Sequence, residues 1–276
     1  MTTIVIGLLQ TTTGIDPAAN AAALVDGIAG LAARGARLIF TPEMSGLLDR
    51  DRTRAAGHIV DEADDRLLAA VQAAAAAHRV WIQIGSLAVR GPLGLANRAL
   101  LIDDHGRITA RYDKIHLFDV DLPDGMRYRE SASYAPGDRA VVAATPWGGL
   151  GLTVCYDVRF PALYGALARA GAAIIAVPAA FTVPTGSAHW HLLLRARAVE
   201  TGAFVVAAAQ TGAHADGRTT FGHSLVVDPW GTVLLDMGEA PGAATCELDL
   251  GAVALTRARI PSLAHARAFA PPIPLV

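Results

Sequence analysis

Residues 150–161 read LGLTVCYDVRFP and join two segments with different hydrophobic patterns. Up to Cys155 the apolar residues alternate, which predicts a buried strand bounded by glycines. From residue 159 to 171 they recur at helical spacing with Pro161 in the first turn, which predicts a helix. Cys155 is therefore expected on a strand-to-helix turn, where the positive end of the helix would lower the pKa of its thiol. The alternative is that Cys155 is a small buried side chain without a chemical role.

Length and composition indicate one compact domain over residues 1–276. The chain has 276 residues, of which 53% are hydrophobic, and no linker-like stretch divides it. A net charge of -2 gives no reason to expect a nucleic acid or an acidic membrane surface as partner. We find neither a secretory signal nor a membrane-spanning run, so a soluble, cytoplasmic protein is expected. Cys155 and Cys246 are the only cysteines, which fits a reducing compartment.

Lys114 is the only lysine among 23 basic residues, and all the others are arginines. An arginine would supply a generic positive charge equally well. The single ammonium group, whose pKa can shift with its surroundings, is therefore a candidate functional group. A coding bias that removed the other lysines is the alternative explanation.

Strands and helices alternate through the first half of the chain. We expect strands over residues 3–9, 38–40 and 80–87, a helix capped by Asp16 that ends at Gly35, and a helix over 64–78. Residues 98–103 and 107–112 are expected to form a hairpin that leads into Lys114. Glu43 follows the second strand directly. Residues 118–138 are expected to form a long functional loop that carries Glu130.

The second half continues the alternation. Strands are expected over residues 173–177, 203–209, 223–227, 233–236 and 245–248, with a loop over 178–186 and a helix over 187–202. His189 and His191 lie two residues apart on that helix, so they make a poor metal-binding pair. The tail from Ala264, with Pro271, Pro272 and Pro274, is expected to be extended. The whole pattern predicts a layered α/β fold with mixed strand directions.

Glu43, Lys114 and Cys155 each follow a predicted strand, and together they can perform acyl transfer. The carboxylate accepts the thiol proton and later passes it to the leaving amine, while the ammonium stabilises the oxyanion. The intermediate would be a thioester that water cleaves.

The segments FTPE at Glu43, RYDKIHLFD around Lys114 and GLTVCYDVRFP around Cys155 resemble the three signature blocks of the nitrilase, or carbon-nitrogen hydrolase, superfamily. The resemblance covers essentially the whole chain. It implies a four-layer α-β-β-α sandwich, commonly dimeric, that uses no metal and no organic cofactor.

The resemblance also implies roles for single residues. Glu43 is expected to be the general base and acid, Lys114 the oxyanion stabiliser and Cys155 the nucleophile. Glu130 matches a second glutamate that orients the lysine. Arg159 matches an arginine that binds a substrate carboxylate in some relatives, although it could instead hold its own helix terminus or a dimer contact. Tyr156 and Phe181 are further expected substrate contacts.

Within the superfamily, the sequence is most similar to the branch that contains deaminated glutathione amidase and omega-amidase. This implies hydrolysis of the terminal carboxamide of a small, carboxylate-bearing substrate to an acid and ammonia. Alternative substrates are 2-oxoglutaramate and N-carbamoyl amino acids. His191 departs from the glutamate of many relatives. Two other classes stay open: a catalytically silent binding protein, and a Cys-His hydrolase that uses His189 or His223.

Overall fold

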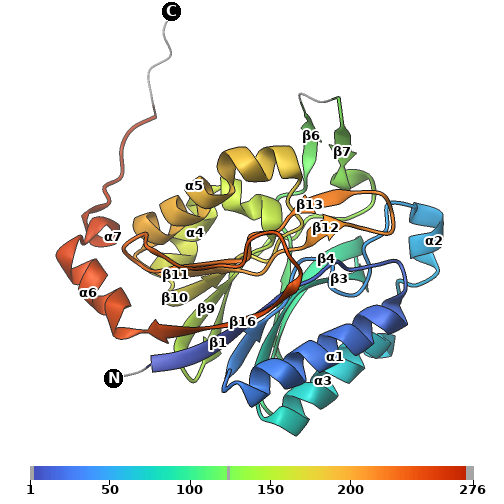
Figure 1. Ribbon diagram of the computed structural model, residues 1–276. Coiled ribbons are helices and arrows are strands. Elements are labelled where there is room, and N and C mark those ends of the chain that lie inside the picture. Colours follow the sequence, from blue (N-terminus) through green and yellow to red (C-terminus); the bar gives the residue numbers. More distant parts are fainter. Residues whose placement is uncertain (1–2, 123–124, 272–276) are drawn as a thin grey trace, which may run out of the picture.

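Two six-stranded mixed sheets form the centre of the computed structural model, which describes residues 3–122 and 125–271 (Figure 1). In order across the first sheet lie β16 (Gly242–Asp249), β1 (Thr3–Gln10), β2 (Leu38–Phe40), β3 (Trp81–Gly91), β4 (Gly94–Ile102) and β5 (Ile108–Asp113). In order across the second lie β15 (Val233–Asp236), β14 (Leu225–Val227), β11 (Phe204–Ala207), β10 (Ala172–Ala176), β9 (Gly148–Leu152) and β8 (Val141–Thr145).

Helices cover the outer face of each sheet. Figure 1 shows α1 (Pro17–Ala33) and α3 (Arg66–His78) on the first sheet, and α4 (Pro161–Arg169) and α5 (Val183–Thr201) on the second. The Asp16 carboxylate caps α1 by accepting a hydrogen bond of 2.9 Å from the Ala18 N–H, as expected from the sequence. The predicted α-β-β-α sandwich is confirmed.

Strand β2 shows how the layers are held together. Successive side chains of a strand point to opposite faces, so Leu38 and Phe40 join the core that includes residues of the second sheet, such as Leu152 and Ile174. Ile39 points the other way and packs with the helix residues Ile28, Leu31 and Val71. Because both faces are covered, β2 is a continuous apolar run that ends at the polar site.

Several expected boundaries were wrong. A 3-10 turn, η3 (Cys155–Arg159), precedes α4, so the predicted helix begins at Pro161 rather than at residue 159. Helix α5 begins at Val183, within the predicted loop, because a proline fits its first turn. The expected loop over 118–138 contains β6 (Asp119–Asp121), β7 (Arg127–Arg129) and the 3-10 turn η2 (Glu130–Ala132).

Several short elements were not predicted, because a segment of three to nine residues shows little hydrophobic periodicity. They are β8, α2 (Arg52–Ala56), η1 (Glu62–Asp64), β12 (Thr211–Ala213), β13 (Thr219–Phe221), α6 (Gly251–Arg259) and α7 (Ser262–His265). Helix α7 also corrects the expectation that the chain is extended from Ala264, because the helix continues to His265 and the next proline comes only at residue 271. Residues 266–271 form neither helix nor strand. Pro272 and Pro274 lie outside the described residues.

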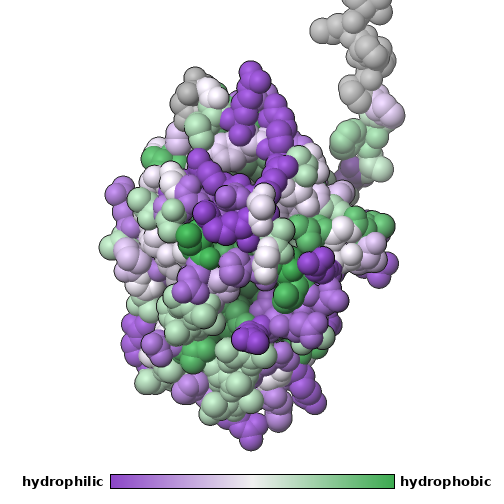
Figure 2. Space-filling model, turned by 90° about the vertical axis from the view of Figure 1, so that its right-hand side faces the viewer, coloured by the Kyte–Doolittle hydropathy of each residue, from purple (hydrophilic) through white to green (hydrophobic). Residues whose placement is uncertain are grey.

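Hydrophilic and hydrophobic residues are interspersed over the face drawn in Figure 2. Among the described residues, no helix combines the length and the apolar character needed to cross a membrane.

Candidate active site

Three chain segments that follow strands bring Glu43, Lys114 and Cys155 together. Glu43 comes after β2, Lys114 after β5 and Cys155 after β9, so the two sheets both contribute to the site. The three residues are buried, with exposed fractions of 5%, 2% and 7%. Charged side chains are rarely buried unless they are paired, and here each has a partner.

The Glu43 carboxylate accepts hydrogen bonds from three sides. Its Oε1 atom accepts from Lys114 Nζ and from Asn97 Nδ2, each at 2.9 Å, and its Oε2 atom accepts from the Ala180 N–H at 2.9 Å. The Cys155 thiol lies close enough to this carboxylate for each group to shift the pKa of the other. One carboxyl group thus interacts with both the ammonium and the thiol.

Close backbone approach places Glu43 against the neighbouring strand. A Cβ atom on Gly85 of β3 would lie only 2.1 Å from the Thr41 carbonyl oxygen, so a larger residue cannot occupy this position without displacing the chain. The Gln210 side chain supports the same turn, because its Nε2 atom donates to the Glu43 carbonyl oxygen at 2.9 Å.

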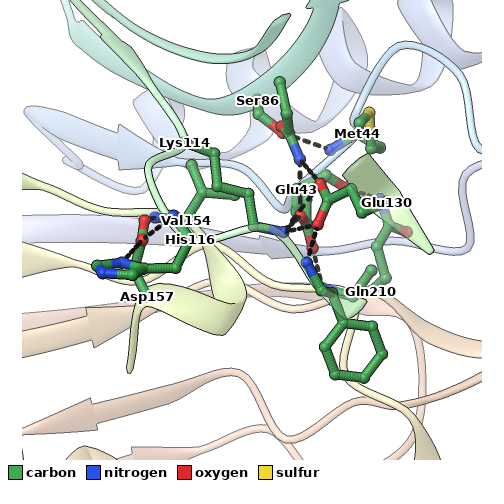
Figure 3. Close-up of polar contacts among 12 residues, drawn as sticks. Glu43, Met44, Ser86, Lys114, His116, Glu130, Val154, Asp157 and Gln210 are labelled. Carbon is green, nitrogen blue, oxygen red and sulfur yellow. Dashed lines mark hydrogen bonds and ion pairs between the residues drawn. The ribbon is translucent and has the colours of Figure 1, made fainter. Parts of the chain in front are cut away.

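The Lys114 ammonium lies between two carboxylates (Figure 3). Besides Glu43, it donates to Glu130 Oε1 at 3.1 Å and to Glu130 Oε2 at 2.8 Å. Glu130 is itself held by the Phe118 N–H, which donates to Oε2 at 2.7 Å, and by Asn97 Nδ2, which donates to Oε1 at 3.0 Å. These contacts fix the ammonium next to the thiol.

Cys155 has a left-handed backbone, with φ of 49°, at the first residue of η3. Such a conformation is costly for a residue with a side chain and is found at functional turns. Its N–H donates to the Pro178 carbonyl oxygen at 2.8 Å. The buried Asp157 holds the turn from the other side by accepting from the Val154 N–H at 2.8 Å and from the Tyr112 hydroxyl at 2.7 Å.

The charges of the site are set by burial and by mutual contact. Burial raises the pKa of the Cys155 thiol, and the negative charge of Glu43 raises it further. Burial opposes ionisation of Glu43, but the charge and hydrogen bond of Lys114, together with contributions from Cys155 and Asn97, outweigh it and lower the pKa of Glu43 below the ordinary 4.5. Burial also opposes the charge of Lys114, yet Glu130 and Glu43 raise the pKa of Lys114 well above 10.5.

The resting site therefore holds a neutral thiol, a carboxylate and an ammonium. The expected low pKa of Cys155 was wrong, because desolvation and the adjacent Glu43 exceed the effect of the following helical turn. A protonated thiol needs a base before it can act as a nucleophile, and Glu43 is in contact with it.

Asn97 is the main contributor that sequence reasoning missed. It is 1% exposed in the interior of β4, and its amide donates to both Glu43 and Glu130. Among the polar side-chain atoms of residues 3–122 and 125–271, its Oδ1 is one of two buried ones without a hydrogen-bond partner. An asparagine within a strand whose other polar residue is Arg98 was the signal that could have identified it. The role of the Ala180 N–H, by contrast, could not be predicted from the sequence, because every residue except proline has a backbone N–H.

Of the three expected substrate contacts, Arg159 and Phe181 lie close to each other, whereas Tyr156 packs against other aromatic rings. Arg159 Cζ lies 5.6 Å from the centre of the Phe181 ring, and Arg159 Nη2 lies 3.3 Å from His189 Nδ1. Tyr156 packs edge-on against Phe118 with ring centres 5.1 Å apart. Phe181 follows Ala180 directly and Tyr156 follows Cys155, so the backbones of these two residues adjoin the buried site.

The histidines near this region have other partners. His189 contacts Arg159, whereas His191 and His223 both contact Asp236. His191, His223 and Asp236 form one of two groups in the described residues whose side chains could hold a metal ion.

Comparison with known proteins gives a consistent result. The sequence profile described as carbon-nitrogen hydrolase matches residues 5–258. The deaminated glutathione amidase of Yersinia enterocolitica is 42% identical, over 95% of this chain and 92% of the relative. The C. elegans NitFhit protein superposes with a TM-score of 0.88 at 36% identity, over 96% of this chain and 65% of that protein. An amidase from Nesterenkonia sp. AN1, solved with acrylamide added to its active-site cysteine, gives a TM-score of 0.78 at 30% identity, over 93% and 98%.

Proposed function

Because the chain belongs to the carbon-nitrogen hydrolase family, we propose that Cys155, Glu43, Lys114 and Glu130 hydrolyse the terminal carboxamide of a small carboxylate-bearing substrate. The products are the acid and ammonia. The ion pair of Glu43 with Lys114, together with the mutual pKa influence of Glu43 and the Cys155 thiol, carries this proposal. A base, a nucleophile and a cationic group that are buried together suit acyl transfer.

The first step forms the thioester. Glu43 takes the thiol proton while sulfur attacks the amide carbon, and Lys114 stabilises the negative charge that develops on the carbonyl oxygen. The tetrahedral adduct then collapses, and the protonated Glu43 gives its proton to the nitrogen, which leaves as ammonia. The sulfur remains bound to the acyl carbon.

The second step regenerates the thiol. Glu43, again ionised, removes a proton from a water molecule that attacks the thioester carbon. When the carbon-sulfur bond breaks, Glu43 returns the proton to sulfur and the acid is released. Glu130 keeps Lys114 charged and in place through both steps, because its two oxygens lie 2.8 and 3.1 Å from the Lys114 Nζ atom.

A substrate similar to deaminated glutathione is favoured by the similarity to the relative of that name. Arg159 would bind the carboxylate, since its guanidinium lies over Phe181, beside the chain segment that carries Ala180. The substrates 2-oxoglutaramate and N-carbamoyl amino acids are the alternatives.

The assembly proposed here is a homodimer of one-domain subunits. Exposed apolar side chains on α5 and α6 support a partner surface, namely Leu192, Val199 and Leu255 with exposed fractions of 68%, 53% and 58%. Light scattering after gel filtration tests this assignment. The free thiols of Cys155 and Cys246 support a reducing, cytoplasmic location.

Mass spectrometry of the protein quenched during turnover tests the chemistry. An added mass equal to the acyl group on the peptide that contains Cys155 is expected, and it reports the nucleophile and the substrate together. A panel of amides scored by ammonia release then ranks the substrates. Turnover without any acyl adduct, together with full activity of Cys155→Ala, would refute the proposal, and a preference for N-carbamoyl compounds would change only the substrate.

A further inference from the structure

Two histidines and one aspartate from three separate segments converge at a second position, which shares no residue with the site described above. His191 lies on α5, His223 precedes β14 and Asp236 ends β15. His191 Nε2 lies 2.9 Å from Asp236 Oδ2, and His223 Nδ1 lies 2.9 Å from Asp236 Oδ1. The possible ligand atoms of all three residues lie within 4.8 Å of one another.

We propose that His191, His223 and Asp236 form a binding site for a divalent transition-metal ion of the zinc class. Two imidazoles and one carboxylate are ligands that Zn²⁺ accepts, and three protein ligands leave one coordination position for water. The metal would join α5 to the β14–β15 hairpin.

The spacing of the ligand atoms is close to that of a coordinated ion. Zinc-nitrogen bonds of about 2.0 Å in a tetrahedron separate neighbouring ligand atoms by roughly 3.3 Å. The distances of 2.9 and 3.2 Å from His223 Nδ1 to the two Asp236 oxygens need only a small increase to reach this value. Each coordinating nitrogen must give up its proton, which moves to the other ring nitrogen when the imidazole stays neutral.

Surrounding contacts hold the ligands in these positions. His223 has a left-handed backbone, with φ of 54°, and its N–H donates to the Gly238 carbonyl oxygen at 2.7 Å. Its own carbonyl oxygen accepts from Trp190 Nε1 at 2.8 Å. The Gly238 N–H donates to Asp236 Oδ1 at 2.9 Å. Ligands that are fixed by a second layer of contacts lose little entropy when a metal binds.

The same side chains can be reached from solvent. The exposed fractions of the His191, His223 and Asp236 side chains are 39%, 21% and 33%. The Phe221 ring stacks on the His223 ring, with centres 4.5 Å apart, and covers one side of the group. An ion could therefore enter without opening the fold, and a water molecule could complete its coordination.

The other candidate group, Asp103, Asp104 and His105, does not offer such a site. All three residues belong to one turn, and Asp103 already forms an ion pair with Arg107 at 2.7 Å. Adjacent residues in a turn come together without any ligand, whereas His191 and Asp236 come from different elements.

Zinc binding measured by competition with a chromophoric chelator tests the proposal. We expect wild type to bind one equivalent of Zn²⁺ through this group, and His191→Ala and Asp236→Asn to bind it at least about tenfold more weakly. Asp236→Asn keeps the shape of the side chain, so it guards against an effect of misfolding. His189→Ala, on the same helix but with Arg159 as its partner, is the matched control and should bind zinc like wild type.

Repeating the titration in a Cys155→Ser background removes the catalytic thiol as a competing ligand. Zinc should also raise the melting temperature of the Cys155→Ser protein by several degrees, but not that of the same protein with Asp236→Asn. Equal affinity in wild type, His191→Ala and Asp236→Asn would overturn the proposal and leave a hydrogen-bonded triad without a metal. Neither outcome depends on amidase activity, so this test and that of the catalytic site can fail separately.

Discussion

Lys114 and Glu43 form an ion pair whose Nζ and Oε1 atoms lie 2.9 Å apart, with side-chain exposed fractions of only 2% and 6%. Both groups are desolvated, so each keeps its charge only because it has buried partners, and Lys114 has a second one in Glu130. The pair links the electrophilic group of the site to the base, and a change at one residue acts on the other.

Lys114→Ala should abolish most of the activity and also reduce stability. It removes the oxyanion stabiliser and leaves Glu43 and Glu130 as unpaired buried carboxylates. We expect amide hydrolysis to fall by about 10²-fold or more and the free energy of unfolding to fall by about 3–5 kcal/mol. Ammonia release and urea denaturation measure the two effects. A fully active Lys114→Ala enzyme would instead support a Cys-His hydrolase.

Stability should depend on pH through Glu43. The pKa of Glu43 is below its ordinary 4.5 in the folded protein because Lys114, with smaller contributions from Cys155 and Asn97, outweighs the effect of burial. A lowered folded pKa means that Glu43 contributes stability above pH 4.5 and that this contribution is lost as pH falls through the folded value. Glu43→Gln should therefore be less stable than wild type at neutral pH, and the difference should shrink in acid. Thermal melts between neutral and acidic pH test this, and a constant difference would contradict it.

Stability should also depend on pH through Lys114, but in the alkaline range. Its pKa is raised above 10.5, since the charges of Glu130 and Glu43 exceed the effect of burial. Its contribution to stability is full below pH 10.5 and is lost as pH rises through the folded pKa. Lys114→Met removes this dependence, so its melting temperature should change less than that of wild type above pH 10.5. The same slope in both proteins would assign the alkaline transition to other groups.

Asn97→Asp should shift the acidic limb of the rate profile upwards. The substitution keeps the size of the side chain but places a third carboxylate next to Glu43 and Glu130. A nearby negative charge raises the pKa of Glu43, so the base becomes protonated at a higher pH, by about one unit or more. The pH dependence of kcat/KM measures the shift. Asn20→Asp, on α1, is the control because the Asn20 amide contacts Gly14 and Gly46 instead, and it should leave the acidic limb in place.

Arg159→Gln should weaken binding of substrates that carry a carboxylate. If the guanidinium binds that group, KM rises by about tenfold while kcat changes little, since Arg159 does not contact the reacting atoms. An amide of similar length without a carboxylate is the comparison, and its KM should not change. Equal increases for both substrates would indicate that Arg159 holds its own turn.

Asp157→Ala should destabilise the turn that carries the nucleophile. It leaves the buried Tyr112 hydroxyl and the Val154 N–H without the acceptor that they share. A loss of about 2–5 kcal/mol in the free energy of unfolding is expected. Asp157→Asn keeps one acceptor oxygen and should lose less. Near-wild-type stability of Asp157→Ala would show that water replaces the carboxylate.

The sequence by itself determined the layered fold and the candidates for the site. Hydrophobic periodicity located β1, β2, α1 and α3, because burial of one face imposes a period on the residues that form it. Motifs at three strand ends identified Glu43, Lys114 and Cys155, and the family resemblance added Glu130. These signals lie in short stretches of consecutive residues, so one sequence is enough to detect them.

Only the tertiary structure decided how the groups act on one another. The contacts of Asn97 with Glu43 and Glu130 span 54 and 33 residues, and that of His191 with Asp236 spans 45 residues. No local sequence pattern predicts contacts between residues so far apart in the chain. The high pKa of the Cys155 thiol has the same origin, because desolvation and the charge of Glu43 arise only when the two sheets pack together.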